Sequence, residues 1–366
     1  MAPRLLIAGG GSGGHAIPAL AIAEAVQRVS EDVEFLFVGT ERGIESRVIP
    51  KAGFRLELIS VMSLSRSLNA SLLRFPFVLA KGFVESVLIV RRYRPDLTVC
   101  TGGYVSGPVG LASAMLGVPL AVHDSNVLPG ITLRILSRAA TLVLLGFEEA
   151  RRKMGGHVRK AVGNPTRLPQ GEIDAGKARE SFGLAPDRRT LLVIGGSQGA
   201  RSINQAVENA LPGIMDDEVQ VLWQTGPKDS VAMALVAEPY GDRVRTVAFI
   251  DEMSPAYRAA DLAVTRSGAM TIAELNLFGV PAILVPLATA AENHQEVNAR
   301  AMEREGWARM ILQRELDGAT LGSAVSDLIG HPENLDRMAR RSSLRGSGDA
   351  ADRIAAELFD RKLLRL

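Results

Sequence analysis

Residues 262–275 read LAVTRSGAMTIAEL, and this stretch decides the fold that the sequence predicts. Apolar residues are followed by a turn of small residues at 267–269 and by a helical run over 271–278. The order of strand, tight turn and helix start is typical of an α/β domain. Because the N-terminal end of a helix presents backbone N–H groups and a partial positive charge, we expect a phosphate group at this turn.

Glu274 has two interpretations. In the first, it lies three residues after Thr271, which is the spacing of a capping box, and its carboxylate only caps the backbone of Thr271. In the second, the carboxylate accepts hydrogen bonds from a ribose while the turn holds a diphosphate. This stretch alone favours the cap, whereas further glycine turns elsewhere in the chain favour the ribose.

The pattern of strand, glycine turn and helix begins both halves of the chain. The first half has it at 4–29 around GGGSGGH, and the second half has it at 191–210 around GGSQGA. A length of 366 residues suits two domains, each with its own core. Gly163 and Pro165 interrupt the pattern, so we predict two α/β domains that are joined near Gly163 and face a ligand-binding cleft.

The composition excludes several classes of protein. Apolar residues make up 47% and charged residues 22%, as in soluble globular proteins, and the net charge of +2 argues against a nucleic-acid binder. The lone Cys100 rules out an intrachain disulfide and fits a reducing cytoplasm. The first apolar run is a strand rather than a secretory signal, and the longest one, 75–90, is too short and too charged to span a bilayer.

Residues 64–94 combine closely spaced apolar side chains with several cations. The first interpretation is a pair of ordinary helices around Pro76, with their apolar sides buried. The second is an exposed apolar patch, ringed by cations, that rests on an anionic membrane surface. The residues alone favour the pair of helices.

The sequence lacks the motifs of several enzyme classes. It has neither a P-loop nor a G-x-S-x-G elbow, and its five histidines and single cysteine have no zinc-ligand spacing. No Asp-x-Asp pair predicts a dedicated metal site, so we expect no cofactor, although stimulation by a divalent metal stays open. Helix ends, hydroxyls and arginine would then neutralise a leaving diphosphate, and the candidates are Ser197, Arg167 and Thr271.

Six motifs, in order along the chain, carry a resemblance to a known family. They are GGGSGGH (9–15), GGYVSGP (102–108), GNPTR (163–167), GGSQGARSIN (195–204), RSGAMTIAE (266–274) and NHQEVNA (293–299). With these motifs the chain resembles the MurG family of peptidoglycan N-acetylglucosaminyltransferases over nearly its whole length.

The resemblance implies the GT-B fold, in which two Rossmann-like parallel-sheet domains face a deep cleft. It implies inverting transfer of GlcNAc from UDP-GlcNAc to the 4-hydroxyl of MurNAc in undecaprenyl-diphosphoryl-MurNAc-pentapeptide, forming a β-1,4 link. Residues 1–163 would hold the acceptor and face the membrane, and 164–344 would bind UDP-GlcNAc. The final helix, at about 345–366, would pack back on the first domain, and other cell-wall synthesis proteins are further partners that the family suggests.

The resemblance also implies site residues. Glu274 would bind the ribose, and the backbone of Ile250 would meet the uracil. Gln295, with His294 beside it, would bind the GlcNAc hydroxyls. Met270, Thr271 and Ser197 would hold the diphosphate, with Arg167 nearby. The remaining substrate-binding residues would be Ala269, Ile272 and Ala273 in the stretch at 262–275, which we call the opening stretch. In the first domain they would be Ser12, Gly13, Gly14 and Asn126.

An inverting displacement needs one general base and no protein nucleophile. His15 is the first candidate, because it ends the first glycine turn and should point into the cleft. The alternative for His15 is a helix-start histidine that bonds only to backbone. His123 and Asp124 are the second candidates. Here the chain departs from the family pattern His-Glu-Gln-Asn, since it has His-Asp-Ser-Asn, and the shorter carboxylate reaches less far.

An acceptor with an undecaprenyl tail implies a peripheral enzyme at the cytoplasmic face of the membrane. The apolar patch then becomes the expected docking surface, with the residues Arg74, Phe75, Phe77, Leu79, Lys81 and Phe83. Three alternatives stay open: another GT-B UDP-sugar enzyme, such as an epimerase or a glycolipid glycosyltransferase; a dinucleotide-binding oxidoreductase; and a non-catalytic membrane-associated binding protein.

Overall fold

The computed structural model describes residues 2–62, 71–167, 171, 174–196, 198–215, 218–344 and 348–364, without the side chains of 71–75. The chain divides into two compact units. The amino-terminal unit comprises Met1–Arg167 and Gly348–Leu366, and the carboxyl-terminal unit comprises Leu168–Ser347. The division falls after Arg167, a few residues beyond the Gly163 boundary that the sequence predicts.

The amino-terminal unit is built on a seven-stranded sheet with the order β3-β2-β1-β4-β5-β6-β7, in which all neighbours are parallel. Central strands such as β4 are continuous apolar runs because both of their faces are covered. The strands are β1 (Arg4–Gly9), β2 (Glu34–Gly39), β3 (Leu56–Leu58), β4 (Leu97–Gly102), β5 (Leu120–Asp124), β6 (Leu142–Leu145) and β7 (Arg159–Ala161).

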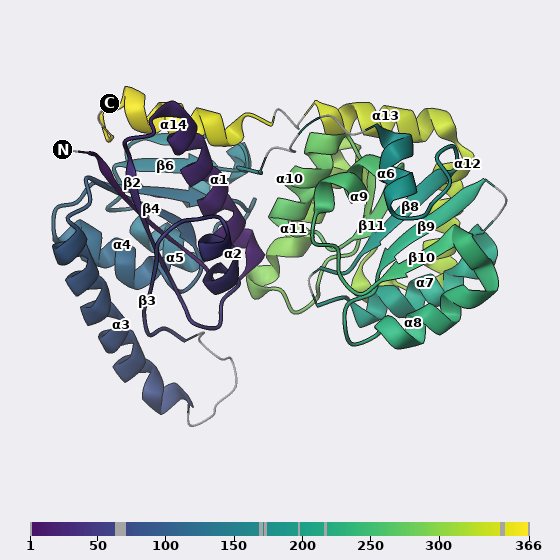
Figure 1. Ribbon diagram of the computed structural model, residues 1–366, viewed down its shortest axis with the longest axis horizontal. Helices are drawn as coiled ribbons and strands as arrows, with labels where there is room; N and C mark the ends of the chain where they lie inside the picture. The colour runs from purple at the N-terminus through teal and green to yellow at the C-terminus, as the bar shows by residue number, and fades with distance from the viewer. Residues whose placement is uncertain are drawn as a thin grey trace. The chain divides into compact units, whose positions relative to one another are not determined.

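Helices cover both faces of this sheet, and successive residues of a strand alternate between the two faces. Leu5 and Ile7 belong to a buried cluster that includes α1 and α14, whereas Leu6 and Ala8 belong to a cluster that includes α3, α4 and α5. α14, from the end of the chain, lies alongside α1 (Figure 1). The helices are α1 (Gly13–Val29), α2 (Glu45–Lys51), α3 (Ser71–Tyr93), α4 (Ser106–Met115), α5 (Ile131–Leu136), the 3-10 helix η1 (Glu148–Lys153) and α14 (Ala350–Asp360).

The carboxyl-terminal unit repeats this construction on a six-stranded parallel sheet with the order β10-β9-β8-β11-β12-β13. Its core lies between the sheet and helices that include α7 and α12, and it contains the fully buried Trp223. The strands are β8 (Arg189–Ile194), β9 (Val219–Gln224), β10 (Val244–Val247), β11 (Leu262–Thr265), β12 (Ala282–Leu284) and β13 (Ala308–Met310).

The helices of the carboxyl-terminal unit follow its strands in alternation until β13, after which the chain is helical (Figure 1). They are α6 (Ala175–Ser181), α7 (Arg201–Ile214), α8 (Ser230–Ala237), η2 (Glu238–Arg243), α9 (Met253–Ala259), α10 (Ala269–Phe278), η3 (Ala291–Asn293), α11 (His294–Glu305), η4 (Gln313–Glu315), α12 (Gly318–Gly330) and α13 (Pro332–Ser343).

Two helices differ from the sequence prediction. Pro18 suits a first helical turn and predicts that the first helix begins there, but α1 begins at Gly13, because the Ser12 carbonyl already accepts the N–H groups of His15 and Ala16. The pair of helices predicted around Pro76 is wrong, since α3 is one helix that contains this proline. Pro76 is the sixth residue of α3, so its missing N–H removes one hydrogen bond of the helix without ending it.

Candidate functional site

The opening stretch, residues 262–275, forms β11, the turn after it and the start of α10. The helix begins directly after Gly268, which is its N-cap and makes no side-chain cap. Thr271 therefore lies inside the first turn, and the capping-box interpretation of Glu274 is wrong. Instead, the half-buried Glu274 accepts a hydrogen bond of 2.7 Å on Oε2 from the hydroxyl of Tyr257.

Burial raises the pKa of Glu274 to about 7, and the hydrogen bond from Tyr257 counteracts part of this rise. As a carboxylate, the group offers only acceptors, which suits two neighbouring hydroxyl donors such as those of a sugar diol. Met270 and Thr271 lie in the first turn of α10, where N–H groups point out of the helix end and attract an anion.

Arg266 ties together the segments around this turn, a role that the sequence did not reveal. Its Nη1 donates to the carbonyls of Val285 and Pro286 and, at 2.9 Å, to Oε1 of Gln313. Its Nη2 donates to Oγ of Ser202, at the start of α7, over 2.9 Å. All four acceptors are uncharged, so the guanidinium places a positive charge between Ser202 of α7 and the turn that precedes α10. An arginine between a buried strand and a small-residue turn is the signal that could have indicated it.

Gln295 lies beside the same turn, as its assignment to the same site requires. The Ser267 hydroxyl donates to the Gln295 carbonyl over 2.8 Å, and the side chain of Gln295 accepts the N–H of Leu287 over 2.9 Å. His294 begins α11, and its Nδ1 donates to the Ala291 carbonyl over 2.7 Å. The residues of NHQEVNA (293–299) and of the opening stretch, which the sequence assigns to the same ligand, are therefore neighbours in one unit.

The third glycine turn, GGSQGA at 195–200, joins β8 to α7 in the same unit. Gly196 has a φ of +89°, which glycine adopts without strain, and its carbonyl accepts a 3.0 Å hydrogen bond from Gln224. Ser197 lies outside the described residues. Ile250 follows β10 and is buried, so its side chain packs inward and its backbone is the part suited to a ligand.

His15 ends the first glycine turn (9–15) of the amino-terminal unit and packs against the second one (102–108). Its Nδ1 lies 3.1 Å from the Thr101 carbonyl, and the Thr101 hydroxyl donates to the His15 carbonyl over 2.8 Å. The ring packs so closely that a Cβ on Gly102 would come within 2.5 Å of Nδ1. Because a carbonyl only accepts, Nδ1 carries the proton and the lone pair lies on Nε2.

Glu45, the first residue of α2, fixes the other side of the first glycine turn and was not predicted from the sequence. Its buried carboxylate accepts the N–H of Gly11 over 2.8 Å, and the N–H and hydroxyl of Thr40 over 2.9 and 2.8 Å. A Cβ on Gly10 or Gly43 would lie within 2.5 Å of this carboxyl group, which explains both glycines. The position of Ser12, Gly13 and Gly14 therefore depends on Glu45.

His123 and Asp124 have structural roles that make them unsuitable as the base. His123 is fully buried, and its Nε2 donates to the Gly163 carbonyl over 3.1 Å. Burial lowers the pKa of His123 to about 4, so the ring is neutral at pH 7. The Asp124 carboxylate accepts the N–H groups of Asn126 and Gly130, each over 2.9 Å, and shapes the loop that carries Asn126.

The expected place of Arg167 at the diphosphate stays a prediction. Arg167 belongs to the amino-terminal unit, and its guanidinium donates two hydrogen bonds, of 2.8 and 3.2 Å, to the Glu24 carboxylate of α1.

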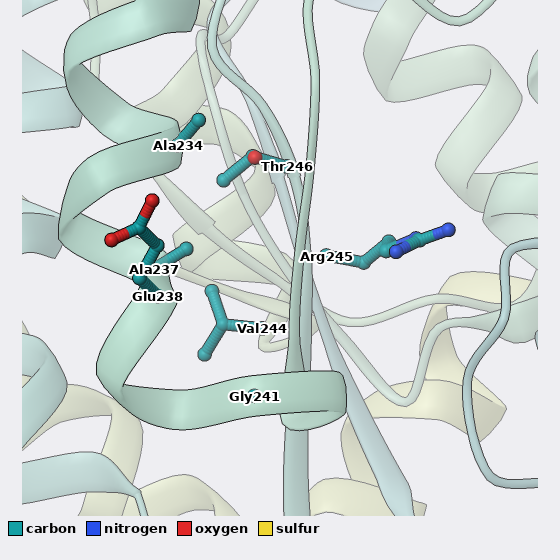
Figure 2. A pocket seen from close by; sticks show the side chains of 7 residues that line it. All are labelled: Ala234, Ala237, Glu238, Gly241, Val244, Arg245 and Thr246. Carbon is teal, nitrogen blue, oxygen red and sulfur yellow. The ribbon is translucent and has the colours of Figure 1, made fainter.

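A surface hollow of about 170 Å³ lies elsewhere in the carboxyl-terminal unit, between α8, η2 and β10. Figure 2 shows Ala234, Ala237, Val244 and Thr246 facing one another across it, while Arg245 points to the other side of the strand. None of the sequence-predicted site residues lines it. Within the described ranges, no three His, Cys, Asp or Glu side chains gather as a metal site would require.

Two domain families match the chain. The Glycosyltransferase family 28 N-terminal domain matches residues 5–145, and the Glycosyltransferase family 28 C-terminal domain matches residues 190–354.

Relatives of similar length share much of the sequence. The UDP-N-acetylglucosamine--N-acetylmuramyl-(pentapeptide) pyrophosphoryl-undecaprenol N-acetylglucosamine transferase of Salinibacter ruber is 41% identical over 98% of this chain and 96% of its own length. The transferase of the same name from Myxococcus xanthus is 42% identical over 98% of this chain and 92% of its own length.

Solved structures share the fold. MurG from Acinetobacter baumannii matches with a TM-score of 0.77 and 25% identity, covering 98% of this chain and 99% of its own. The glycosyltransferase SnogD from Streptomyces nogalater matches with a TM-score of 0.67, covering 98% of this chain and 99% of its own, and at 17% identity this likeness concerns the fold alone.

Proposed function

Because this chain belongs to glycosyltransferase family 28, we propose that it transfers N-acetylglucosamine from UDP-GlcNAc to the MurNAc unit of undecaprenyl-diphosphoryl-MurNAc-pentapeptide. The observation that carries this proposal is the similarity to transferases of that name along almost the whole chain. The α/β fold class and the resemblance to the MurG family are confirmed by the same comparisons.

The carboxyl-terminal unit binds the donor in this proposal. Glu274 accepts the ribose hydroxyls, and the first turn of α10, with Met270 and Thr271, receives the diphosphate. The uncharged surroundings of Arg266 leave its positive charge to act on the same group. Gln295 and His294 meet the GlcNAc hydroxyls. Charge that develops on the leaving UDP is thereby met by a helix end and an arginine, with no cofactor.

The amino-terminal unit supplies the base. Nε2 of His15 takes the proton from the acceptor 4-hydroxyl while that oxygen attacks C1 of GlcNAc. The bond between C1 and the diphosphate oxygen breaks in the same displacement, and UDP leaves with the electron pair. One displacement inverts the configuration at C1, which gives the β link. In this proposal, the glycine turn before His15, with Ser12, Gly13 and Gly14, meets the transferred sugar.

The direct test of this function is turnover with UDP-GlcNAc and a MurNAc-pentapeptide diphosphate that carries a short polyprenyl tail. We expect release of UDP together with a disaccharide lipid, which mass spectrometry identifies. Conversion of UDP-GlcNAc to an epimer without lipid product, or UDP binding with no turnover, would instead support one of the alternatives.

An apolar face on three packed helices of the amino-terminal unit suits the membrane surface. Phe77, Val84 and Leu88 of α3 are 78%, 56% and 59% exposed, and Lys81 lies on the same stripe. The neighbouring α4 and α5 add exposed apolar side chains at Leu111, Met115, Ile131 and Ile135. We call these residues of α3, α4 and α5 the α3–α5 face, and we propose that it docks on anionic lipid.

Not every predicted patch residue belongs to the α3–α5 face. Leu79 is 45% exposed. Phe83 packs against the buried cluster that includes Leu6 and Ala8, so it does not belong to the exposed patch. The side chains of Arg74 and Phe75 lie outside the described residues. Among the helices that the structure describes, none has both the length and the apolar character to cross a bilayer.

Replacing Phe77 and Leu88 with serine is expected to weaken binding to vesicles that contain anionic lipid by roughly tenfold or more per side chain, because inserting each apolar side chain stabilises binding by about 1.5 kcal/mol or more. Vesicle co-sedimentation measures this. The matched control is serine at Val231 and Leu235, which are 77% and 60% exposed on α8 of the other unit. Equal binding by the wild type and the α3 variant would exclude the α3–α5 face as the docking surface.

A further inference from the structure

We infer that Tyr257 is a positioning residue for donor binding, because its hydroxyl holds the Glu274 carboxylate ionised and oriented toward the ribose. This inference rests on the proposed function, in which Glu274 is the ribose ligand. It adds a residue from a different helix to the site and predicts how donor affinity depends on pH.

The geometry fixes Tyr257 tightly. Its side chain is 3% exposed on α9, and its hydroxyl donates to Oε2 of Glu274 over 2.7 Å. Its ring lies against Phe278, one turn after Glu274 on α10, with 5.6 Å between the ring centroids. Because α9 packs on α10, the hydroxyl cannot move away from the carboxylate without disturbing this packing.

The hydrogen bond leaves room for a diol. A carboxylate has about four acceptor positions, and the Tyr257 hydroxyl uses one of them on Oε2. Two ribose hydroxyls can then donate to the remaining positions. A protonated Glu274 would carry a donor of its own on one oxygen and would compete with a ribose hydroxyl. Donor binding therefore requires the ionised form.

Among the residues that the structure describes, few charged groups face Glu274. From α9, Tyr257 touches it, and Arg258 lies over the ring of Phe278, 5.6 Å from its centroid. From α13, the uncharged Ser342 donates to the Leu275 carbonyl and to Oδ1 of Asn276, while the guanidinium of Arg341 donates to the Glu305 carbonyl. The protonation of Glu274 is therefore controlled by burial, which raises its pKa, and by Tyr257, which lowers it.

The sign of the pH effect follows. The ionised fraction of Glu274 falls as the pH drops through its pKa of about 7, so the affinity for UDP-GlcNAc should fall on the acid side of neutrality. Tyr257→Phe keeps the ring and removes the hydroxyl. Since the lost hydrogen bond stabilised the ionised form, the pKa of Glu274 should rise further, and the acid loss of affinity should begin at a higher pH.

The experiment is calorimetric titration of the full chain with UDP-GlcNAc from about pH 5.5 to about pH 8.5, a range in which its diphosphate does not titrate. In Tyr257→Phe we expect the midpoint of the affinity loss to move up by about one pH unit. Affinity should return toward the wild-type value at the alkaline end. A merely structural defect would lower the affinity equally at every pH. Tyr240→Phe, in the same unit and away from α10, is the control and should keep the wild-type profile.

Glu274→Gln separates failure of this inference from failure of the proposed function. We expect it to bind UDP-GlcNAc weakly and without the pH dependence, while Glu238→Gln at the surface hollow behaves as the wild type. Unchanged binding by Glu274→Gln would overturn the ribose assignment itself. If Glu274→Gln loses binding but Tyr257→Phe keeps the wild-type midpoint, or loses affinity equally at every pH, the role of Tyr257 is overturned.

Discussion

Replacing His15 with alanine is expected to lower kcat by about 10²–10⁴-fold and to leave the KM for UDP-GlcNAc close to its wild-type value. The Thr101 carbonyl fixes the Nδ1–H tautomer, so Nε2 keeps the lone pair that a general base needs. Steady-state kinetics with both substrates varied separate the two parameters. The effect should fall on kcat because the residues assigned to the uracil, the ribose and the diphosphate lie in the other unit.

The control for this experiment is His157→Ala, which removes an exposed histidine from the same unit and should keep the wild-type kcat. Added imidazole should restore part of the activity of His15→Ala, because the small base can occupy the vacated volume. A kcat equal to that of the wild type would remove His15 as the base and leave it as a histidine bonded only to backbone.

Glu45→Ala should lower the free energy of unfolding of the amino-terminal unit by about 2–4 kcal/mol, because three donors lose their charged acceptor and a buried side chain is deleted. This is a large share of the ~5–15 kcal/mol by which domains are stable. The donors are two N–H groups and a hydroxyl, from Gly11 and Thr40. Denaturant unfolding followed by circular dichroism measures the change.

Glu45→Gln tests the same contacts with the side-chain volume kept. Its amide oxygen can still accept, but its NH₂ group faces a donor, so the loss should lie between that of alanine and zero. Glu149→Ala, an exposed carboxylate of the same unit, is the matched control. An unfolding midpoint of Glu45→Ala equal to the wild-type value would mean that the turn holds its shape without this carboxylate.

Local chemistry made the turns and strands predictable. Gly11 and Gly102 have φ of +87° and +111°, which residues with a Cβ adopt only with strain, so glycine at these positions indicates a turn. The strands are short apolar runs because parallel sheets are covered on both faces. The same reasoning failed for Glu274, because spacing from Thr271 indicates a cap only if the helix begins there, and α10 begins earlier.

The residues that the sequence did not reveal all act over long separations. Glu45 bonds to Gly11, Arg266 to Ser202 and Gln313, and Tyr257 to Glu274 on the next helix. The residues around Glu45 and Tyr257 do not distinguish a buried hydrogen-bonding side chain from an ordinary surface one, and only the place of Arg266 between a buried strand and a turn gave a local signal. The sequence alone allowed Phe83 and Leu88 to lie either in the exposed patch or in the core. The packing of α3 decided this, because Phe83 contacts the buried cluster and Leu88 is exposed.

By itself, the sequence determined two parallel-sheet units, the three glycine turns, and the family to which those turns and Glu274 belong, because each depends on backbone freedom and apolar runs that neighbouring residues encode. Only the tertiary structure decided which ring nitrogen of His15 carries the proton, what holds the Arg266 guanidinium, and what holds Glu274. Those outcomes depend on single hydrogen bonds between distant segments, and the geometry of such bonds is set when strands and helices pack, not by the order of residues along the chain.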